Sequence, residues 1–486
     1  MGERVEMATA GASTSSTETD GDGRLQAAAR PPRRGFRPFQ RALALLLLVA
    51  PLCFAVAEVV LHVRDHPELS LIDEHIHVDY LARVQRVDLP RRGDLLTQEA
   101  MHEWACRGHT GALPTTRCGD RPYDPADFFP PVRFSTAYIY FPAYYGVSAA
   151  VSGLVDLVVD TNAVDVSRYL GAGWLAAGLL ATWCVLRELE FGRVASSLSL
   201  VAIAINPLLI HSSSIVNPSA AALLSGAGVM LAVLWWERQK VPLFVPLAAS
   251  VLAVALATTN FAGVGVAMLY VLWRLVWPRS GERGHEPGIP SRRAAVGLLA
   301  GVAFTTLAMN VGWSAQVDQR ATVDNESVFG WAEKPSVPID VALSQLFDPR
   351  QPWSIDRTVN PNYQFQLGGF DFGVLRSGVA LIGLAAIGGL LVVGMHGVEP
   401  RRRVLAMATF VGLLVFGFVF VLLQYAAYRT GFRALNRYSF AALPGFAVGL
   451  AVLFSDRRGR FIAVPVLGLF SFLAIVALVQ STHPVE

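Results

Sequence analysis

Long apolar runs recur along the whole chain and are separated by short polar segments. Most runs are close to the ~20 residues that a helix needs to cross the ~30 Å hydrocarbon core of a bilayer. The pattern therefore predicts an all-α integral membrane protein. We expect about eleven membrane-spanning helices, at residues 41–63, 168–187, 194–212, 218–236, 241–259, 261–277, 294–313, 374–394, 404–424, 438–454 and 461–479.

A twelfth apolar stretch, residues 136–158, has a different character. It carries Pro142 and a cluster of tyrosines. Amphipathic aromatic rings prefer the depth of the lipid headgroups. We therefore expect an interfacial helix here rather than another span.

Composition agrees with a membrane protein. Of the 486 residues, 53% are hydrophobic and 16% are charged, and the mean hydropathy is +0.44. A chain that is so apolar throughout is not typical of a soluble multi-domain enzyme.

Positive charge alternates between the two ends of the predicted spans. Cytoplasmic loops carry the excess of Lys and Arg, so the alternation predicts a multi-pass protein of the cell membrane with a cytoplasmic N-terminus. The basic clusters that we place inside lie at residues 30–37, 187–193, 238–240, 279–293, 401–403 and 457–460.

The remaining segments define the domain organisation. Residues 1–40 are rich in small and polar residues, which predicts a disordered cytoplasmic tail. The first span reads as a signal anchor. The polytopic domain would cover residues 41–480, with a short tail at 481–486, and two large loops, 64–167 and 314–373, would be extracytoplasmic.

The first large loop contains Cys106 and Cys118, whereas Cys53 and Cys184 lie inside apolar runs. An extracytoplasmic compartment permits oxidation. We predict a disulfide between Cys106 and Cys118, with a pair of free thiols as the alternative.

Five titratable side chains crowd the start of the same loop. Alone, such a cluster is most simply a solvated loop. At the boundary between water and lipid, Asp73 or Glu74 would instead serve as a base towards a polar substrate. A third interpretation is a divalent metal site on an extended segment, because alternation puts two of the histidines on one side. The stretch is LIDEHIHVDYL, with Asp73, Glu74, His75, His77 and Asp79.

Arginines cluster near the other end of the chain. Arg429, Arg433 and Arg437 recur every four residues, which would place them along one side of a helix that enters the bilayer from outside. They would either snorkel to anionic headgroups or bind a lipid phosphate, which arginine recognises bidentately.

A third polar element, INPLLIHSSSIVNPSAAALLS, lies between the third and fourth spans. It supplies Asn206, Ser212, Asn217 and Ser219. Polar caps at helix ends explain such residues, but this turn would face the same outer surface as the other two clusters.

The order of these motifs resembles the GT-C superfamily of polyprenyl-phosphate-sugar-dependent glycosyltransferases. The closest likeness is to an uncharacterised family of predicted glycosyltransferases common in actinobacteria, and the abundance of Ala, Val and Arg suits such an organism. The matching segments are the acidic start of the first loop, the Tyr-rich PAYY, SRYLG, SSSIVNPSA and LNRYSFAALP.

The resemblance implies sugar transfer from a polyprenyl-phosphate donor to an acceptor hydroxyl on a glycan or lipid, for assembly of the cell envelope, without nucleic acid. It implies catalytic roles for Asp73, Glu74 and His77. It also implies donor-phosphate contacts from Arg437 and Tyr438, with Arg433, Arg429 and Arg168 beside them, and a second-loop polar position at Asn217.

Many GT-C enzymes carry an aspartate where this chain has Ser219. We therefore expect metal-independent chemistry and no cofactor, with a divalent metal as the alternative. Two rival classes remain: a flippase or secondary transporter, which would show ionisable residues or broken helices near the bilayer midplane, and a non-catalytic assembly subunit. A single active site requires that Asp73 and Arg437 lie close together.

Overall fold

The computed structural model describes most of the chain between residues 37 and 480. The predicted disordered tail at 1–40, apart from its last residues, and the tail at 481–486 lie outside that part. The described residues are 37–70, 73–108, 116–119, 121–128, 134–276, 291–324, 328, 336–346, 372–397, 399–428 and 434–480. The described residues from Ala44 onward form one compact unit.

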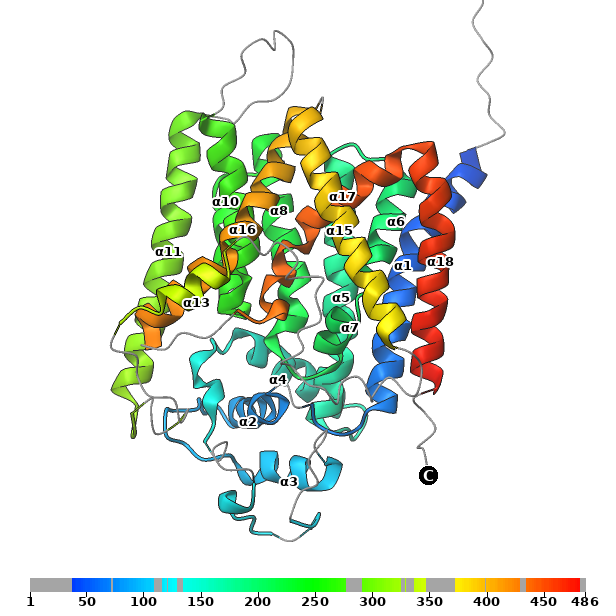
Figure 1. Ribbon diagram of the computed structural model, residues 1–486. Coiled ribbons are helices and arrows are strands. Elements are labelled where there is room, and N and C mark those ends of the chain that lie inside the picture. The colour runs from blue at the N-terminus through cyan, green and yellow to red at the C-terminus, as the bar shows by residue number, and fades with distance from the viewer. Residues whose placement is uncertain are drawn as a thin grey trace, which may run out of the picture. The chain divides into compact units, whose positions relative to one another are not determined.

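All regular structure in the described ranges is helical, and the extended backbone there makes an isolated bridge between Leu95 and Phe134. The predicted all-α membrane fold is confirmed (Figure 1). The helices of the bundle are α1 (Arg37–Asp65), α5 (Ala163–Glu188), α6 (Arg193–Ala204), α7 (Pro207–Ser214), η3 (Pro218–Ala221), α8 (Ala222–Glu237), α9 (Phe244–Leu256), η4 (Thr258–Asn260), α10 (Phe261–Val276), α11 (Arg292–Gln319), α15 (Phe372–His396), α16 (Pro400–Tyr428), η6 (Asn436–Ala442), α17 (Leu443–Ser455) and α18 (Arg457–Gln480).

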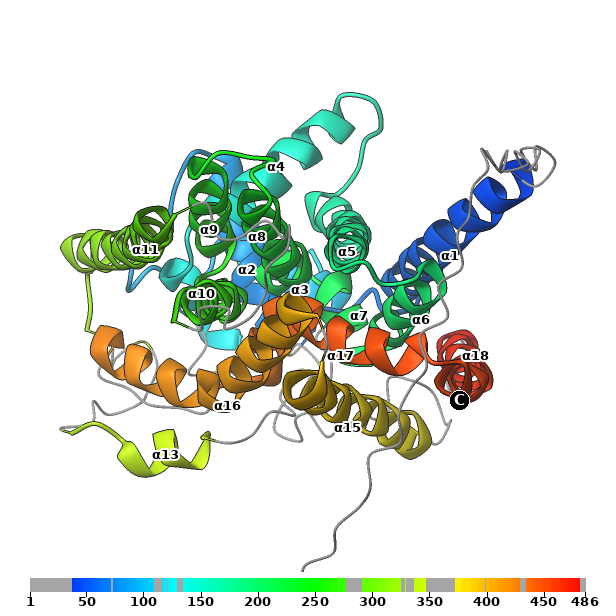
Figure 2. The same ribbon diagram turned by 90° about the horizontal axis from the view of Figure 1, so that it is seen from above.

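A second group of helices gathers at one end of this bundle, as Figure 1 shows for α2 and α3. Seen from above, α4 extends sideways from the bundle (Figure 2). This group consists of α2 (Glu74–Gln85), α3 (Gln98–Arg107), η1 (Pro125–Asp127), η2 (Thr136–Ile139) and α4 (Ala143–Asp156). The short helix α13 (Ile339–Ser344) instead packs against α16 of the bundle (Figure 1).

Each predicted span is helical, but not every one is a straight crossing. Nine helices in the described ranges are long and apolar enough to cross a bilayer. The predicted span 194–212 is a pair, α6 and α7, bent by 67°, because Asn206 caps a new helix that starts at Pro207, and proline cannot donate the next hydrogen bond. The predicted span 241–259 contains α9, whose 13 residues cover only about 20 Å.

The interfacial segment predicted at 136–158 folds as η2 and α4. The end of α4 exposes Leu154, Leu157 and Val158. These side chains suit the apolar side of a membrane surface. The interfacial position itself stays a prediction, since it depends on where the bilayer lies.

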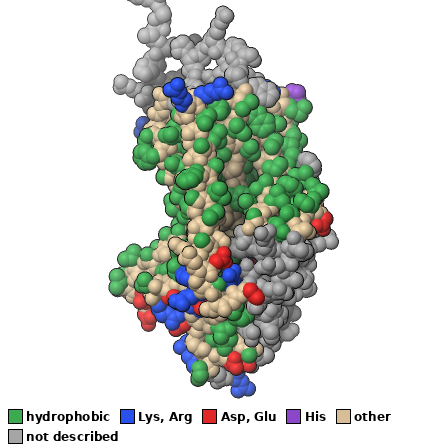
Figure 3. Space-filling model, turned by 90° about the vertical axis from the view of Figure 1, so that its left-hand side faces the viewer, with side chains coloured by type: hydrophobic (Ala, Val, Ile, Leu, Met, Phe, Trp, Pro, Cys, Tyr) green, Lys and Arg blue, Asp and Glu red, His purple; other side chains and the backbone are tan. Residues whose placement is uncertain are grey.

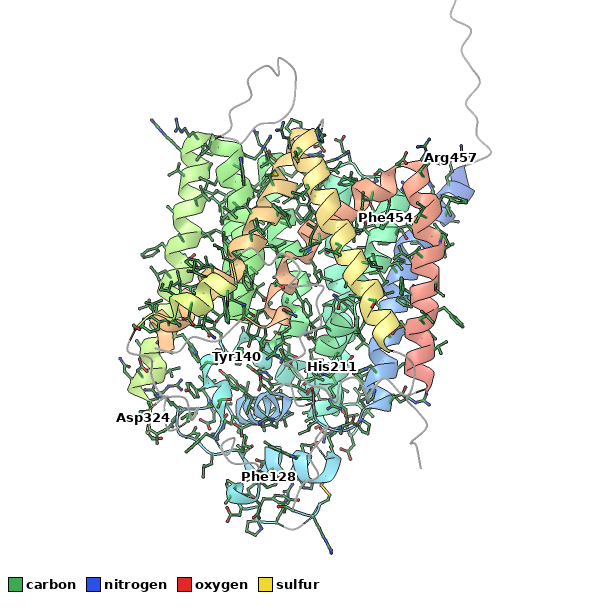
Figure 4. The ribbon with its side chains drawn as sticks, in the orientation of Figure 1. Phe128, Tyr140, His211, Asp324, Phe454 and Arg457 are labelled. Atoms are coloured by element: carbon green, nitrogen blue, oxygen red, sulfur yellow. A yellow bond between two sulfur atoms is a disulfide. The ribbon has the colours of Figure 1, made fainter. Side chains whose placement is uncertain are left out.

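Charge divides the two ends of the bundle. Figure 3 shows Lys and Arg side chains at the upper end, and acidic and basic side chains mixed at the lower end, where α2 and α3 lie. Arg457 marks the upper end in Figure 4. The arrangement matches the pattern from which we predicted the orientation. The side on which the N-terminus lies stays a prediction.

The first large loop is a folded layer with its own core. Ile76 and Tyr80 of α2, Trp104 of α3 and Tyr144 of α4 are buried together with Val216, which belongs to the turn between α7 and η3. The outer layer therefore packs directly onto the end of the bundle.

The predicted disulfide is present. Cys106 in the last turn of α3 is bonded to Cys118, with an S–S distance of 2.03 Å. The other two cysteines, Cys53 and Cys184, are free.

Candidate functional site

The acidic stretch after the first span is not a solvated loop. Residues 74–85 form α2, and Glu74, His75, His77 and Asp79 are buried. The simplest interpretation of the sequence is therefore wrong for four of the five side chains. Only Asp73 stays accessible, with 48% of its side chain exposed.

Asp73 is the N-cap residue of α2 but does not cap the helix. Its backbone has a φ of 56°, in the left-handed region that aspartate tolerates better than most residues. Its carboxylate makes no hydrogen bond to the first turn. Oδ2 instead accepts a hydrogen bond from Nη2 of Arg437 at 3.0 Å. The two residues, 364 positions apart, lie together as a single site requires.

Arg437 lies in η6, and only 4% of its side chain is exposed. Its guanidinium carbon lies 5.1 Å from the centre of the Tyr438 ring. Nε has no hydrogen-bond partner among the described residues. The arginine is thus buried with part of its donor capacity unused.

Two glycines allow η6 to lie this deep in the bundle. The segment packs against α8 and α10, where the backbone oxygen of Ala441 lies directly over Gly226 and Gly263. A Cβ atom at either glycine would overlap that oxygen. Small residues let membrane helices approach closely, and here they fix the depth of Arg437.

The structure describes one of the three arginines predicted along one helix face. Leu435 is extended, and Arg437 follows it in the 3₁₀ segment η6. Arg437 therefore does not lie on a regular α-helix. Arg429 and Arg433 lie outside the described residues, so their predicted roles stay untested.

Glu74 and Arg168 form a second buried ion pair. Nε and Nη2 of Arg168 donate to the two carboxylate oxygens at 2.8 and 2.7 Å. The remaining N–H groups of Arg168 donate to the backbone oxygens of residues 66–68. Glu74 also accepts hydrogen bonds from the amides of Ser70 and Val216.

This saturation bears on two predictions. All five N–H groups of the Arg168 guanidinium are bonded within the protein. Glu74 is fully buried and accepts four hydrogen bonds, so Asp73 is the more accessible of the two predicted bases. The predicted roles of Glu74 and Arg168 in the reaction stay predictions. The pair holds the chain that leads into Asp73 against α5 and the turn before η3.

His77 faces the tyrosines of α4. Its Nδ1 lies 2.6 Å from the hydroxyl of Tyr145, and Nε2 has no hydrogen-bond partner among the described residues. Burial, then the charge of Arg437, holds the pKa of His77 well below its usual value. The ring is therefore neutral at neutral pH, and its direct role in catalysis stays a prediction.

The metal interpretation of the acidic stretch does not fit the geometry. α2 turns His75, His77 and Asp79 to different partners: the His75 ring lies against Trp104, and Asp79 binds Arg83 at 3.0 Å. In the described ranges, the one metal-compatible group is His102 with Cys106 and Cys118, whose sulfurs are already bonded to each other.

Asp73 itself also lacks partners for a cation. Its charged neighbour is the Arg437 guanidinium, and the adjacent Glu74 is committed to Arg168. A divalent cation needs several oxygen ligands. Metal-independent chemistry remains our prediction.

The second-loop polar residue has a local structural partner. Oδ1 of Asn217 accepts a hydrogen bond from the Ser219 amide at 2.8 Å, which caps η3. The Asn217 amide donates to the hydroxyl of Tyr144. The predicted polar turn is therefore buried and connects the bundle to α4 through the Tyr144 hydroxyl.

Several residues of the site were not singled out from the sequence. Tyr140 lies at the boundary between the bundle and the outer helices (Figure 4), and its hydroxyl interacts with Tyr438. Burial, then Tyr438 and Asp73, holds the pKa of Tyr140 well above its usual value. On the other side, His211 bonds Ser70 at 2.9 Å. Buried tyrosine hydroxyls need partners, so the cluster of tyrosines at residues 138–145 was the available signal for Tyr140.

Comparison with known proteins places the fold. No protein-family model and no curated protein matches the sequence. The archaeal oligosaccharyltransferase AglB from Archaeoglobus fulgidus, solved with an inhibitory peptide and a dolichol-phosphate, is similar over 92% of this chain and 56% of its own, with a TM-score of 0.50 and 12% identity. ArnT from Cupriavidus metallidurans, bound to undecaprenyl phosphate, is similar over 92% of this chain and 76% of its own, with a TM-score of 0.43 and 14% identity.

The likeness to AglB shows that this chain shares the fold of the matched part of that oligosaccharyltransferase. The chain spans little more than half the length of AglB. The closer likeness to an actinobacterial family stays a prediction.

Proposed function

We propose that this protein is a glycosyltransferase that moves one sugar from a polyprenyl-phosphate donor to an acceptor hydroxyl at the outer face of the cell membrane. The observation that carries the proposal is the contact between Asp73 and Arg437 at 3.0 Å. A half-exposed carboxylate and a buried guanidinium with a spare donor are the two groups that such a transfer needs. AglB, which shares the fold, was solved with a dolichol-phosphate.

Arg437 would bind the donor phosphate, and Asp73 would act as the general base. The carboxylate takes the proton of the acceptor hydroxyl, and the acceptor oxygen forms a bond to the anomeric carbon with inversion. The bond from that carbon to the phosphate oxygen breaks, and its electron pair leaves with the polyprenyl phosphate. Arg437 stabilises the charge that grows on the phosphate.

The tyrosines would hold Arg437 in place. The ring of Tyr438 lies against the guanidinium, which is a favourable cation–π arrangement. Its hydroxyl interacts with Tyr140 of the outer layer. Tyr438 and Tyr140 thus join the bundle to the layer that carries Asp73.

The transporter alternative predicts polar groups deep in the bundle, and two such features exist. Glu58 of α1 is buried, and α6–α7 is broken. However, His62, one turn after Glu58, lies 3.1 Å from His211, which bonds Ser70 beside Glu74. His62 and the broken pair α6–α7 are thus connected to the outer site and do not mark a separate transport site.

The experiment measures sugar transfer by purified protein with a panel of labelled polyprenyl-phosphate sugars. Asp73→Asn should lower transfer by roughly 10²–10⁴-fold, as expected for a lost general base. Arg437→Ala should lower both transfer and donor binding, and Arg437→Lys should restore only part, because a point charge cannot replace the bidentate fork.

A matched control is Glu99→Gln. Glu99 has a similar side-chain exposure, 49%, and pairs with Arg86 on the same outer layer. It should transfer sugar as the wild type does. Wild-type rates in Asp73→Asn, in protein shown to be folded, would contradict the assignment of the base.

A further inference from the structure

We propose that Asp73 occupies part of the phosphate site on Arg437 until the donor arrives, so that donor binding releases the base. The inference rests on the proposed function and adds an order to it. The donor would bind first, and the acceptor would then meet a free carboxylate.

A guanidinium binds an anion through two neighbouring nitrogens. Nε and one Nη form a fork that takes two oxygens at once. Arg168 shows this fork in use: its Nε and Nη2 hold both oxygens of Glu74, at 2.8 and 2.7 Å.

The same fork on Arg437 is half filled. Nη2 donates to Asp73 at 3.0 Å, while Nε has no partner among the described residues. A phosphate that binds this fork brings a second negative charge beside the Asp73 carboxylate on Nη2, and the repulsion between the two anions would drive the exposed carboxylate away. Arg437 would then exchange one anion for another and would not be left buried and unpaired, which is the costly state.

The Asp73 side chain can move away from Arg437. Its side chain is 48% exposed, compared with 4% for Arg437, so the carboxylate can turn into water while the arginine stays. It makes no capping bond to α2, and no bond of the helix has to break when it moves. The displaced carboxylate would remain next to the phosphate, where the acceptor hydroxyl must arrive.

This exchange predicts an unusual result for an active-site acid. If Asp73 competes with phosphate for Arg437, its removal should strengthen donor binding although it abolishes transfer. With a short-chain polyprenyl phosphate in detergent as the probe, Asp73→Asn and Asp73→Ala should bind roughly five- to tenfold tighter than the wild type. The alanine variant covers the case in which asparagine still accepts from Nη2.

Two comparisons make the effect specific. In the double variant Asp73→Ala/Arg437→Ala, binding should be no tighter than in Arg437→Ala, because the competition acts through that arginine. Glu99→Gln removes one negative charge of equal exposure and should bind the probe as the wild type does. Thermal unfolding of each variant confirms that it is folded.

The possible failures are distinct. If Arg437→Ala weakens binding but neither Asp73 variant tightens it, the exchange is wrong and the proposed function stands. If Arg437→Ala binds the probe as well as the wild type does, Arg437 is not the phosphate site, and the proposed function fails with the inference.

Discussion

Asp73 and Glu74 are neighbours, and each pairs with an arginine far along the chain, yet the two pairs differ in almost every respect. The side chains of Glu74 and Arg168 are 0% and 1% exposed. Both carboxylate oxygens and all three guanidinium nitrogens make hydrogen bonds. Asp73 and Arg437 share one hydrogen bond, between a half-exposed carboxylate and a buried guanidinium.

The difference separates structure from function. Buried polar groups are nearly always satisfied, so a saturated pair holds the fold and has nothing left for a ligand. A buried arginine with a spare N–H is an exception that a bound anion would resolve. The predictions below test this division.

The largest effect is expected for Arg168→Leu. This change leaves Glu74 buried without its partner, which should lower the free energy of unfolding by about 3–5 kcal/mol. Thermal unfolding in detergent measures the loss. The double variant Glu74→Leu/Arg168→Leu should regain part of it, and a single variant as stable as the wild type would contradict the structural role.

Removing the disulfide tests whether the outer layer needs a covalent cross-link in addition to the ion pair of Glu74 with Arg168. Cys106→Ser/Cys118→Ser should cost roughly 3 kcal/mol by the chain-entropy estimate for a short loop. Polyprenyl-phosphate binding should change little, because neither cysteine contacts Asp73 or Arg437. Mass spectrometry that finds both thiols free in membranes would refute the bond.

The third prediction concerns pH, and its sign follows from His77. Since the pKa of His77 is well below its usual value in the folded protein, the unfolded chain binds a proton first as the pH falls. Stability should be fully present above about pH 6.5 and fall below it, by up to about 1.4 kcal/mol per pH unit. Between pH 5 and pH 8, the free energy of unfolding of His77→Gln should depend less on pH than that of the wild type. The same pH dependence in both proteins would contradict the prediction.

The smallest effect should come from Arg437→Leu. In the Asp73–Arg437 pair, Nε of the arginine has no hydrogen-bond partner among the described residues. The substitution removes this incompletely bonded buried charge, so the free energy of unfolding should change by less than about 1 kcal/mol. A loss as large as that of Arg168→Leu would show that both pairs are structural and would end the comparison.

The chemistry of these pairs was only partly predictable from the sequence. The resemblance to GT-C enzymes brought Asp73 and Arg437 together, whereas spacing alone predicted an α-helix at Arg437, which lies in the 3₁₀ segment η6. Asp73 and Glu74 are both acidic. Asp73 precedes α2 with a left-handed backbone, and Glu74 is the first residue of the helix, so only the fold decides which carboxylate is buried against Arg168.

The fold was easier to predict than its interruptions. Length and hydropathy revealed every apolar helix, because the bilayer imposes both. They did not reveal that α9 ends at Leu256 or that α6–α7 is bent. Such breaks depend on whether neighbouring helices satisfy the freed backbone groups, as Asn260 does by donating to the backbone oxygen of Ala253.

The two glycines under η6 limit how this protein can be engineered. Replacing helix glycines by alanine is a common way to stabilise a protein for crystallisation or assay. At Gly226 and Gly263 the added methyl group would meet the Ala441 oxygen and push η6 outward. Gly226→Ala and Gly263→Ala should therefore lower the melting temperature and also disturb the alignment of Arg437 with Asp73, although neither glycine belongs to the proposed site.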